Sequence, residues 1–177
     1  MDLKIENHFG PVIIGIDPGW ADLGFAIIGA PTNKDNALRL AFSKTYTPRD
    51  YASNYDFIQE AFSGIPLSVT VLGVHIERFV SYNGIRLNPE DILMLIGAIQ
   101  YYCNSAGLTV YMHRAIDWKS SLCKYLVRTS KGGFKNPYTS FDKRYSSFAA
   151  KWITGKDFPT DHEADAVCLA SMEMLDK

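Results

Sequence analysis

The chain has 177 residues, a hydrophobic content of 47% and a mean hydropathy of −0.07, values typical of a globular protein. We expect a single domain over residues 1–177, with a substantial core. No apolar run approaches the ~20 residues of a membrane span, the N-terminus lacks the pattern of a signal or transit peptide, and the three cysteines are far apart. These features favour a cytoplasmic protein with reduced thiols and no membrane association.

The net charge of −1 hides a strong asymmetry along the chain. Residues 114–156 hold ten basic and two acidic side chains, a net charge of +8, which leaves −9 for the remainder. Such a division is typical of a polyanion-binding surface beside an acidic metal site. A pair of solvated basic helices would give the same composition, so charge alone does not choose between the two interpretations.

Five apolar or β-rich runs are predicted as strands. They cover residues 12–16, 23–28, 38–46, 69–77 and 108–112. The first three follow one another with only turn sequences between them, which favours an antiparallel meander. The last two alternate with helical segments, so the pattern as a whole predicts an α/β fold with a mixed sheet.

Helical patterns lie between and after the later strands. The predicted helices cover residues 51–62, 88–107, 117–126 and 141–152, and a last helix begins at residues 159–163. In the first helix, apolar residues recur at helical spacing at Tyr55, Ile58 and Phe62. The second begins with Asn88 as a cap, followed by acidic residues that complement the positive helix end. Thr160 and Glu163 form a capping box for the last helix.

Acidic residues stand at the ends of two apolar strands and at the start of the last helix. Asp17 follows the first strand, Glu77 ends the fourth, and His162 and Asp165 share one face of the last helix because they are three residues apart. Each alone fits a turn, a strand end or a helix surface. An unpaired buried carboxylate is costly, however, and acids from distant segments become tolerable when they converge on a divalent cation. We therefore predict a metal site.

The segment Gly15-Ile16-Asp17-Pro18-Gly19, the strand that ends in a glutamate and the terminal His-x-x-Asp-Ala motif resemble the RuvC-like Holliday junction resolvases of the RNase H-like superfamily. The resemblance in motif order and spacing covers almost the whole chain. It implies a five-stranded mixed sheet flanked by helices on both faces, two Mg²⁺ or Mn²⁺ ions, a homodimer and no nucleotide cofactor. It also implies paired, symmetric nicks across a four-way DNA junction.

Position by position, the resemblance assigns metal-binding and catalytic roles to Asp17, Glu77, His162 and Asp165. We expect Asp17 to bridge both ions, Glu77 and Asp165 to hold one each, and His162 to act as a ligand or proton carrier. The resemblance also places Lys119 and Lys143 near the scissile phosphate.

We expect the basic segment to bind DNA phosphates through Lys119, Lys131, Lys135, Lys143 and Arg144. Phe79 or Tyr82 is expected to stack on an unpaired base at an opened junction, although both also fit as core or hairpin aromatics. Trp20, where the family has a small polar residue, and the long basic loop 130–135 depart from the family pattern. The departures indicate a divergent member, for which a phage origin is one interpretation.

Several other functions share parts of this pattern. The Gly-Ile-Asp-x-Gly motif also opens the phosphate-binding hairpin of actin and the sugar kinases, but that fold needs a second domain and a second phosphate loop. Ribonuclease H, transposases and CRISPR-type nucleases use similar acids, and the basic segment after the fifth strand favours a resolvase over an enzyme that cleaves RNA–DNA hybrids. A catalytically inactive junction-binding module is a further alternative, against which the complete set of acids argues.

Overall fold

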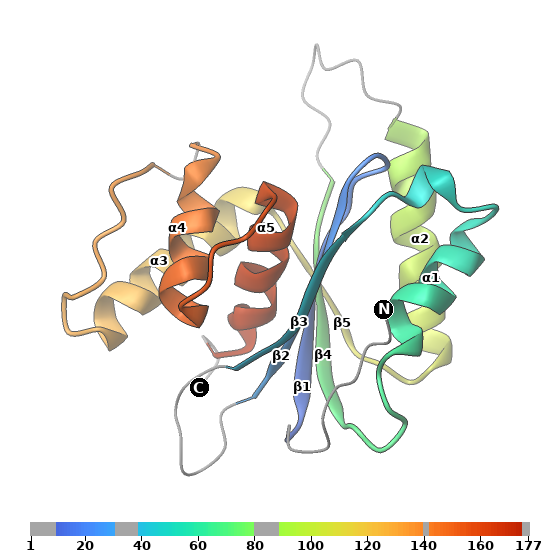
Figure 1. Cartoon of the computed structure of the whole chain (residues 1–177), viewed down its shortest axis with the longest axis horizontal. Coiled ribbons are helices and arrows are strands. Elements are labelled where there is room, and N and C mark those ends of the chain that lie inside the picture. Colours follow the sequence, from blue (N-terminus) through green and yellow to red (C-terminus); the bar gives the residue numbers. More distant parts are fainter. Residues whose placement is uncertain (1–9, 31–38, 80–88, 140–141, 175–177) are drawn as a thin grey trace.

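A five-stranded sheet with helices on both faces forms the centre of the molecule (Figure 1). The computed structural model describes residues 10–30, 39–79, 89–139 and 142–174. The strands are β1 (Val12–Asp17), β2 (Leu23–Gly29), β3 (Arg39–Tyr46), β4 (Val71–Glu77) and β5 (Val110–His113). Their order in the sheet is β3-β2-β1-β4-β5. The α/β fold with a mixed sheet is therefore confirmed.

The pairing of the strands explains why two of the acids meet. β1 pairs antiparallel with β2, and β2 antiparallel with β3, as the meander predicts. β4 lies on the other side of β1 and runs parallel to it, with Ile16 beside Ile76. Because parallel strands end at the same edge of a sheet, the residues that follow this pair, Asp17 and Glu77, are neighbours there.

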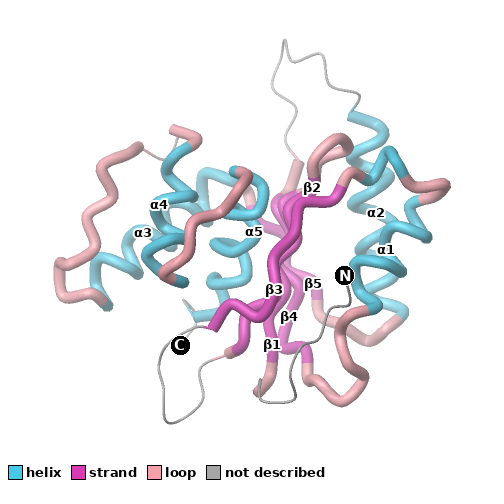
Figure 2. Tube along the Cα trace, viewed as in Figure 1, coloured by secondary structure: helices cyan, strands magenta, loops and turns pink. Residues whose placement is uncertain are grey.

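Helices α1 (Asn54–Ser63) and α2 (Pro89–Ser105) cover one face of the sheet, and α3 (Ala115–Thr129), α4 (Arg144–Thr154) and α5 (Asp161–Ala170) lie on the other (Figure 2). Two short 3-10 helices, η1 (Pro48–Asp50) and η2 (Ser171–Met174), were not predicted. No helix within the described ranges has the length and apolarity that a membrane crossing requires. All five predicted α-helices are present, with shifted bounds.

Helix α1 differs from its prediction in both its start and its apolar face. It begins at Asn54, because the Ser53 side chain accepts a hydrogen bond from the Asp56 backbone N–H and caps the helix there. Its buried residues are Phe57, Ile58, Ala61 and Phe62. Tyr55, expected on this face, is 65% exposed, because it lies in the first turn at the margin of the face that these four residues form. The expected cap Asn88 of α2 lies outside the described residues.

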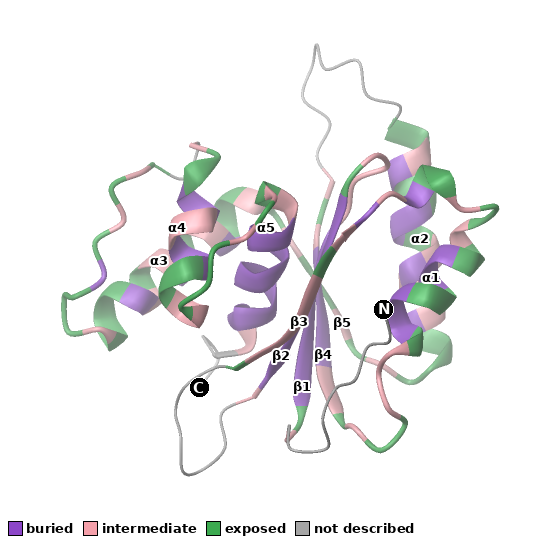
Figure 3. Cartoon of the chain, in the orientation of Figure 1, coloured by how far each residue is buried: buried purple, intermediate pink, exposed green. Residues whose placement is uncertain are grey.

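Successive side chains of the strands alternate between two apolar cores, one on each face of the sheet. Buried residues accordingly occur in the sheet and in the helices on both sides of it (Figure 3). Ile14 and Ile16 of β1 point into the core under α1 and α2, whereas Ile13 points into the core under α3, α4 and α5. Asp17 follows the parity of Ile13, so its side chain emerges on the α5 face. The alternation of β1 therefore directs the first acid toward the helix that carries Asp165.

Helix α5 packs very closely against β1 and β2 because both strands have a glycine beneath it. A Cβ atom at Gly15 would lie 1.9 Å from the Ala166 carbonyl oxygen, and one at Gly24 would lie 1.8 Å from the His162 carbonyl oxygen. Both distances are far shorter than a van der Waals contact. The two glycines thus set how near the N-terminal half of α5 comes to the sheet.

Glu163 fixes the start of α5 in a way that the capping box did not predict. The Thr160 hydroxyl accepts a hydrogen bond from the Glu163 backbone N–H, so the cap itself is confirmed. The Glu163 carboxylate instead accepts hydrogen bonds from Ser43 at 2.9 Å and Thr45 at 3.3 Å, both on edge strand β3. This clamp joins the first turn of α5 to a strand 120 residues earlier in the chain.

We predict that Gly15→Ala destabilises the protein by at least about 1–3 kcal/mol, the usual cost of overpacking, because the backbone of α5 must move away from β1. Gly97→Ala is the matched control: Gly97 lies in α2 with no atom within 4 Å of the place that an added Cβ would occupy, and alanine favours a helix by up to about 1 kcal/mol. Chemical denaturation measures both variants. Equal stability of Gly15→Ala and the wild type would contradict the close approach of α5.

Candidate metal-binding active site

Three carboxylates meet at the end of the sheet, as the sequence predicts. Asp17 comes from the end of β1, Glu77 from the end of β4 and Asp165 from the second turn of α5. One oxygen of each lies within 4.8 Å of those of the other two, a spacing that suits ligands of a shared metal ion. They are the one group of acidic, histidine or cysteine ligands with this spacing in the described part of the chain.

The three acids are held together at an electrostatic cost. Burial, followed by the charges of Asp17 and Asp165, raises the pKa of Glu77 to about 7. Burial and the charge of Asp17 likewise raise the pKa of Asp165 to about 6. Both shifts mean that the ionised forms are disfavoured, because the carboxylates have lost water and repel one another. A cation between them would remove this cost.

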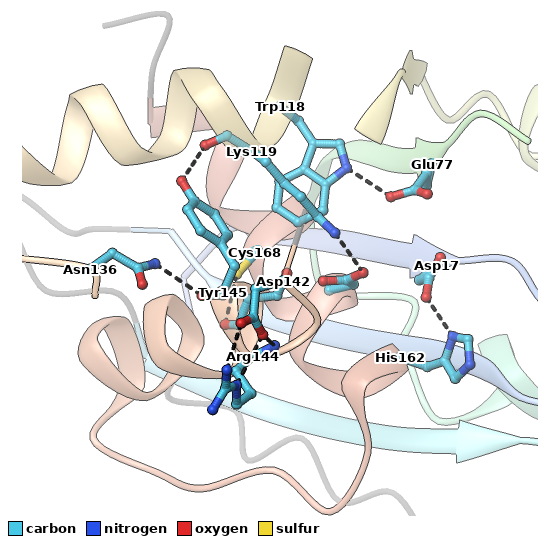
Figure 4. A network of polar contacts seen from close by, with 12 residues as sticks. Asp17, Glu77, Trp118, Lys119, Asn136, Asp142, Arg144, Tyr145, His162 and Cys168 are labelled. Atoms are coloured by element: carbon cyan, nitrogen blue, oxygen red, sulfur yellow. Dashed lines mark hydrogen bonds and ion pairs between the residues drawn. The ribbon is translucent and has the colours of Figure 1, made fainter. Parts of the chain in front are cut away.

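His162 contacts the acidic cluster through Asp17. Its Nδ1 lies 2.6 Å from Asp17 Oδ2 (Figure 4). This hydrogen bond is the largest cause of a raised His162 pKa, so the protonated ring is favoured and donates to the carboxylate. The imidazole is 42% exposed, which leaves it accessible to solvent. Of the four predicted ligands, the three carboxylates therefore lie close to one another. His162 is outside this group and is hydrogen-bonded to Asp17.

Two consecutive residues of α3 each contact one of the acids. The indole Nε1 of Trp118 donates a hydrogen bond of 2.9 Å to Glu77 Oε2 (Figure 4). The ammonium group of Lys119 lies 3.4 Å from Asp165 Oδ2. Lys119 was predicted near the scissile phosphate, but the contact of Trp118 was not predicted. An Asp-Trp-Lys sequence on an amphipathic helix carries no signal that its tryptophan faces an acid 41 residues earlier.

The other predicted DNA-binding residues lie in the connection between α3 and α4 or at the start of α4. Lys131 and Lys135 are exposed in the loop after α3, and Lys143 is exposed directly before α4. Arg144 forms a bidentate pair with Asp142, at 2.7 and 3.0 Å, and its guanidinium lies over the Tyr138 ring. Part of the positive charge of this segment is therefore already neutralised within it.

The aromatic residues of the sequence prediction fall in different surroundings. Phe79 is half-buried, two residues beyond Glu77, and so lies at the correct edge of the sheet for a DNA contact. Tyr82 lies outside the described residues. Trp20, the departure from the family pattern, packs against the core under α1 and α2. Its size is therefore explained by packing.

The donor set fits a divalent cation. Carboxylate oxygens are the ligands that Mg²⁺ prefers, and the histidine beside Asp17 makes Mn²⁺ competitive. Asp165 Oδ1 is buried and has no hydrogen-bond partner among the described residues. The Ser146 side chain, however, favours the ionised form of this carboxylate through a hydrogen bond, so the protein itself offers this oxygen a partner.

Comparison with solved structures identifies the fold. No protein-family model and no curated protein sequence matches the chain.

Thermus thermophilus RuvC in complex with a Holliday junction substrate matches over 93% of both chains, with a TM-score of 0.65 and 19% identity. The yeast mitochondrial Holliday junction resolvase Ydc2 matches over 97% of this chain and 81% of its own, with a TM-score of 0.57 and 15% identity. The fowlpox virus resolvase in complex with its substrate Holliday junction DNA matches with a TM-score of 0.56 and 15% identity, over 93% of this chain and 99% of its own. The chain therefore shares the fold of these three resolvase structures, which is the fold that the sequence resemblance implied.

In metal-free buffer, the free energy of unfolding should fall as the pH rises from about 5 to about 8. Glu77 and Asp165 hold a proton to about pH 7 and 6 in the folded chain but only to about pH 4 when unfolded, so the folded state binds more protons over this range. The contribution of these two carboxyl groups to the free energy of unfolding is fully present below about pH 4. It is lost as the pH rises through their folded-state pKa values of about 6 and 7. Thermal unfolding at a series of pH values measures it.

Asp165→Asn should flatten this pH dependence and raise metal-free stability at pH 8 by about 1–3 kcal/mol, because one pKa unit corresponds to about 1.4 kcal/mol. Asp161→Asn, which removes an exposed acid from the same helix, is the control and should retain the wild-type slope. A metal-free stability that is independent of pH, together with an Asp165→Asn variant less stable than the wild type, would refute mutual repulsion of the acids.

Proposed function

We propose that the chain is a metal-dependent endonuclease that resolves four-way DNA junctions by paired, symmetric nicks. The observation that carries this proposal is the convergence of Asp17, Glu77 and Asp165, from three distant segments, within a fold whose solved examples include resolvases bound to Holliday junction DNA. We place the activity in one nuclease domain built on the sheet. Three free cysteines support action in a reducing cytosol.

The acidic cluster would hold two Mg²⁺ or Mn²⁺ ions. When bound, such ions supply a nucleophilic water at neutral pH and stabilise the charge on the leaving 3′-oxygen. Asp17 is the acid best suited to bridge both ions, because its charge acts on both Glu77 and Asp165. Glu77 would then hold one ion from the β4 side, and Asp165 the other from α5.

His162 and Lys119 would carry the remaining tasks at the site. The His162 ring is partly exposed and hydrogen-bonded to Asp17, so it can exchange a proton between the site and solvent. The Lys119 ammonium, which lies 3.4 Å from Asp165 Oδ2, would contact a non-bridging oxygen of the scissile phosphate. Together these two cations offset part of the negative charge that would otherwise repel DNA.

The basic segment would hold the arms of the junction. Helices α3 and α4 lie on the same side of the sheet as α5 (Figure 1). Arg144 begins α4, and Lys131, Lys135 and Lys143 lie in the connection between α3 and α4. Contacts of this kind bind phosphates without reading sequence, and their strength falls steeply with salt. Phe79, just past Glu77, would stack on a base at the opened centre of the junction.

The central test compares three substrates: a four-way DNA junction, a linear duplex and an RNA–DNA hybrid, each with and without Mg²⁺. We expect symmetric nicks that are confined to the junction and require Mg²⁺. Cleavage of the hybrid would instead favour a ribonuclease H activity. Junction binding without any cleavage would favour an inactive binding module.

Asp17→Asn should lower the rate of junction cleavage by at least about a hundredfold, since loss of an outer-shell partner of a metal ligand already costs about 10–100-fold. Junction binding, measured by fluorescence anisotropy, should persist. Asp161→Asn is the matched control and should cleave normally, because Asp161 is an exposed first-turn acid outside the cluster. Near wild-type nicking by Asp17→Asn in Mg²⁺ would rule out the assignment.

Paired nicks require two active sites, and the outer face of α2 suits a homodimer. Leu93, Met94 and Tyr101 on this helix are 55%, 59% and 76% exposed. Met94 and Tyr101 are seven residues apart and Leu93 is next to Met94, so the three exposed side chains share one side of the helix. An exposed apolar stripe opposite the buried one is typical of a helix that packs against a second copy.

Tyr101→Glu should convert a dimer into a monomer of 19.8 kDa, measured by analytical ultracentrifugation. The introduced charge would have to be buried without a partner at the interface. Leu67→Glu is the control, because Leu67 is fully exposed in the connection between α1 and β4 and should leave the dimer intact. A wild-type chain that remains monomeric at tens of micromolar would refute this interface.

A further inference from the structure

Trp118 is the largest fully buried side chain among the described residues, and its single polar atom faces the metal site. Its Nε1 donates to Glu77 Oε2 at 2.9 Å, while the ring packs in the core between α3, α5 and the sheet. Leu122 and Leu126, one and two turns later on α3, are buried in the same core. Trp118 is therefore the end of an apolar stripe, at the point where the stripe reaches the acids.

Core packing alone does not account for a tryptophan at this position. A buried N–H must find an acceptor or lose the free energy of its hydration, and a purely apolar ring would fill the core without that requirement. The indole satisfies it with a carboxylate that two like charges repel. When Glu77 is ionised, as a metal ligand must be, this hydrogen bond is charge-assisted and so stronger than a bond between neutral groups.

The hydrogen bond also restricts where Glu77 can point. Glutamate has a long side chain, and rotation toward solvent would take its charge away from Asp17 and Asp165. The indole N–H, anchored in a packed core, opposes that rotation and uses only one of the lone pairs on the carboxylate. The remaining lone pairs stay available for a cation, in the orientation that the indole imposes.

Helix α3 is itself held in place next to this contact. The Tyr145 hydroxyl of α4 donates a hydrogen bond of 2.6 Å to the Lys119 backbone carbonyl (Figure 4). The Lys119 side chain reaches Asp165, so neighbouring residues of α3 contact two of the three acids. Given the metal site of the proposed function, we propose that Trp118 is a positioning residue that holds Glu77 in its metal-binding orientation and thereby raises the affinity of the site for divalent cations.

Trp118→Phe removes the N–H and keeps an aromatic ring in the core. We expect it to weaken Mn²⁺ binding, measured by isothermal titration calorimetry with the metal alone, by about 10–100-fold, the usual effect of losing an outer-shell partner. Leu122→Val is the matched control, because it thins the same apolar stripe without touching an acid. Leu122→Val should bind Mn²⁺ with the affinity of the wild type. This should hold even if its unfolding midpoint falls by as much as that of Trp118→Phe.

A second replacement separates the hydrogen bond from packing. Site-specific incorporation of 3-benzothienylalanine at position 118 puts sulfur in place of the N–H and preserves the bicyclic shape. It should weaken Mn²⁺ binding to the same degree as Trp118→Phe, and it keeps the test decisive if the phenylalanine variant folds poorly. Wild-type affinity in this protein would overturn the positioning role.

The failure of this inference is distinguishable from the failure of the metal site. If Glu77→Gln weakens Mn²⁺ binding and both Trp118 replacements do not, Trp118 only fills the core, and the metal site remains. If the wild type and Glu77→Gln bind Mn²⁺ equally weakly, the metal site itself is wrong and the positioning role is lost with it. Equal weakening by Trp118→Phe and Leu122→Val would likewise overturn the positioning role.

Discussion

Mutual repulsion among Asp17, Glu77 and Asp165 is the constraint on which the rest of this structure depends. The three groups are brought out of water and within 4.8 Å of one another, and the raised pKa values of Glu77 and Asp165 express the resulting cost. A protein that needed only a stable core would place apolar residues there. The arrangement would become favourable with a multivalent cation bound, and this is the physical basis of the proposed metal-dependent activity.

Several features of the fold act against that repulsion. The parallel pairing of β1 and β4 fixes Asp17 beside Glu77, and Gly15 and Gly24 allow α5 to approach closely enough to bring Asp165 to them. The Glu163 clamp ties the start of α5 to β3, and α3 contacts the flanking acids through Trp118 and Lys119. The site is thus supported by the sheet and by a neighbouring helix. Rigid support of this kind is what a metal site needs when its ligands repel each other.

The sequence predicted the parts of this arrangement that depend on local pattern. Apolar runs that end in Asp17 and Glu77 indicate strands with acids at their ends, and the spacing of His162 and Asp165 on a helix indicates a shared face. Contacts between distant side chains have no such local signal. The Trp118 bond to Glu77 and the bond of Glu163 to Ser43 span 41 and 120 residues, and depend on how the layers pack. Tyr55 was misplaced for a related reason: helical spacing groups it with Ile58 and Phe62, but packing against the sheet buries Phe57 and Ala61 beside them instead.

Crystals grown with Mn²⁺ and measured at the manganese absorption edge would test the central claim most directly. We expect two anomalous peaks about 4 Å apart among Asp17, Glu77 and Asp165, with Asp17 shared by both. Crystals that hold Mn²⁺ elsewhere on the chain, with no peak among these three carboxylates, would contradict it.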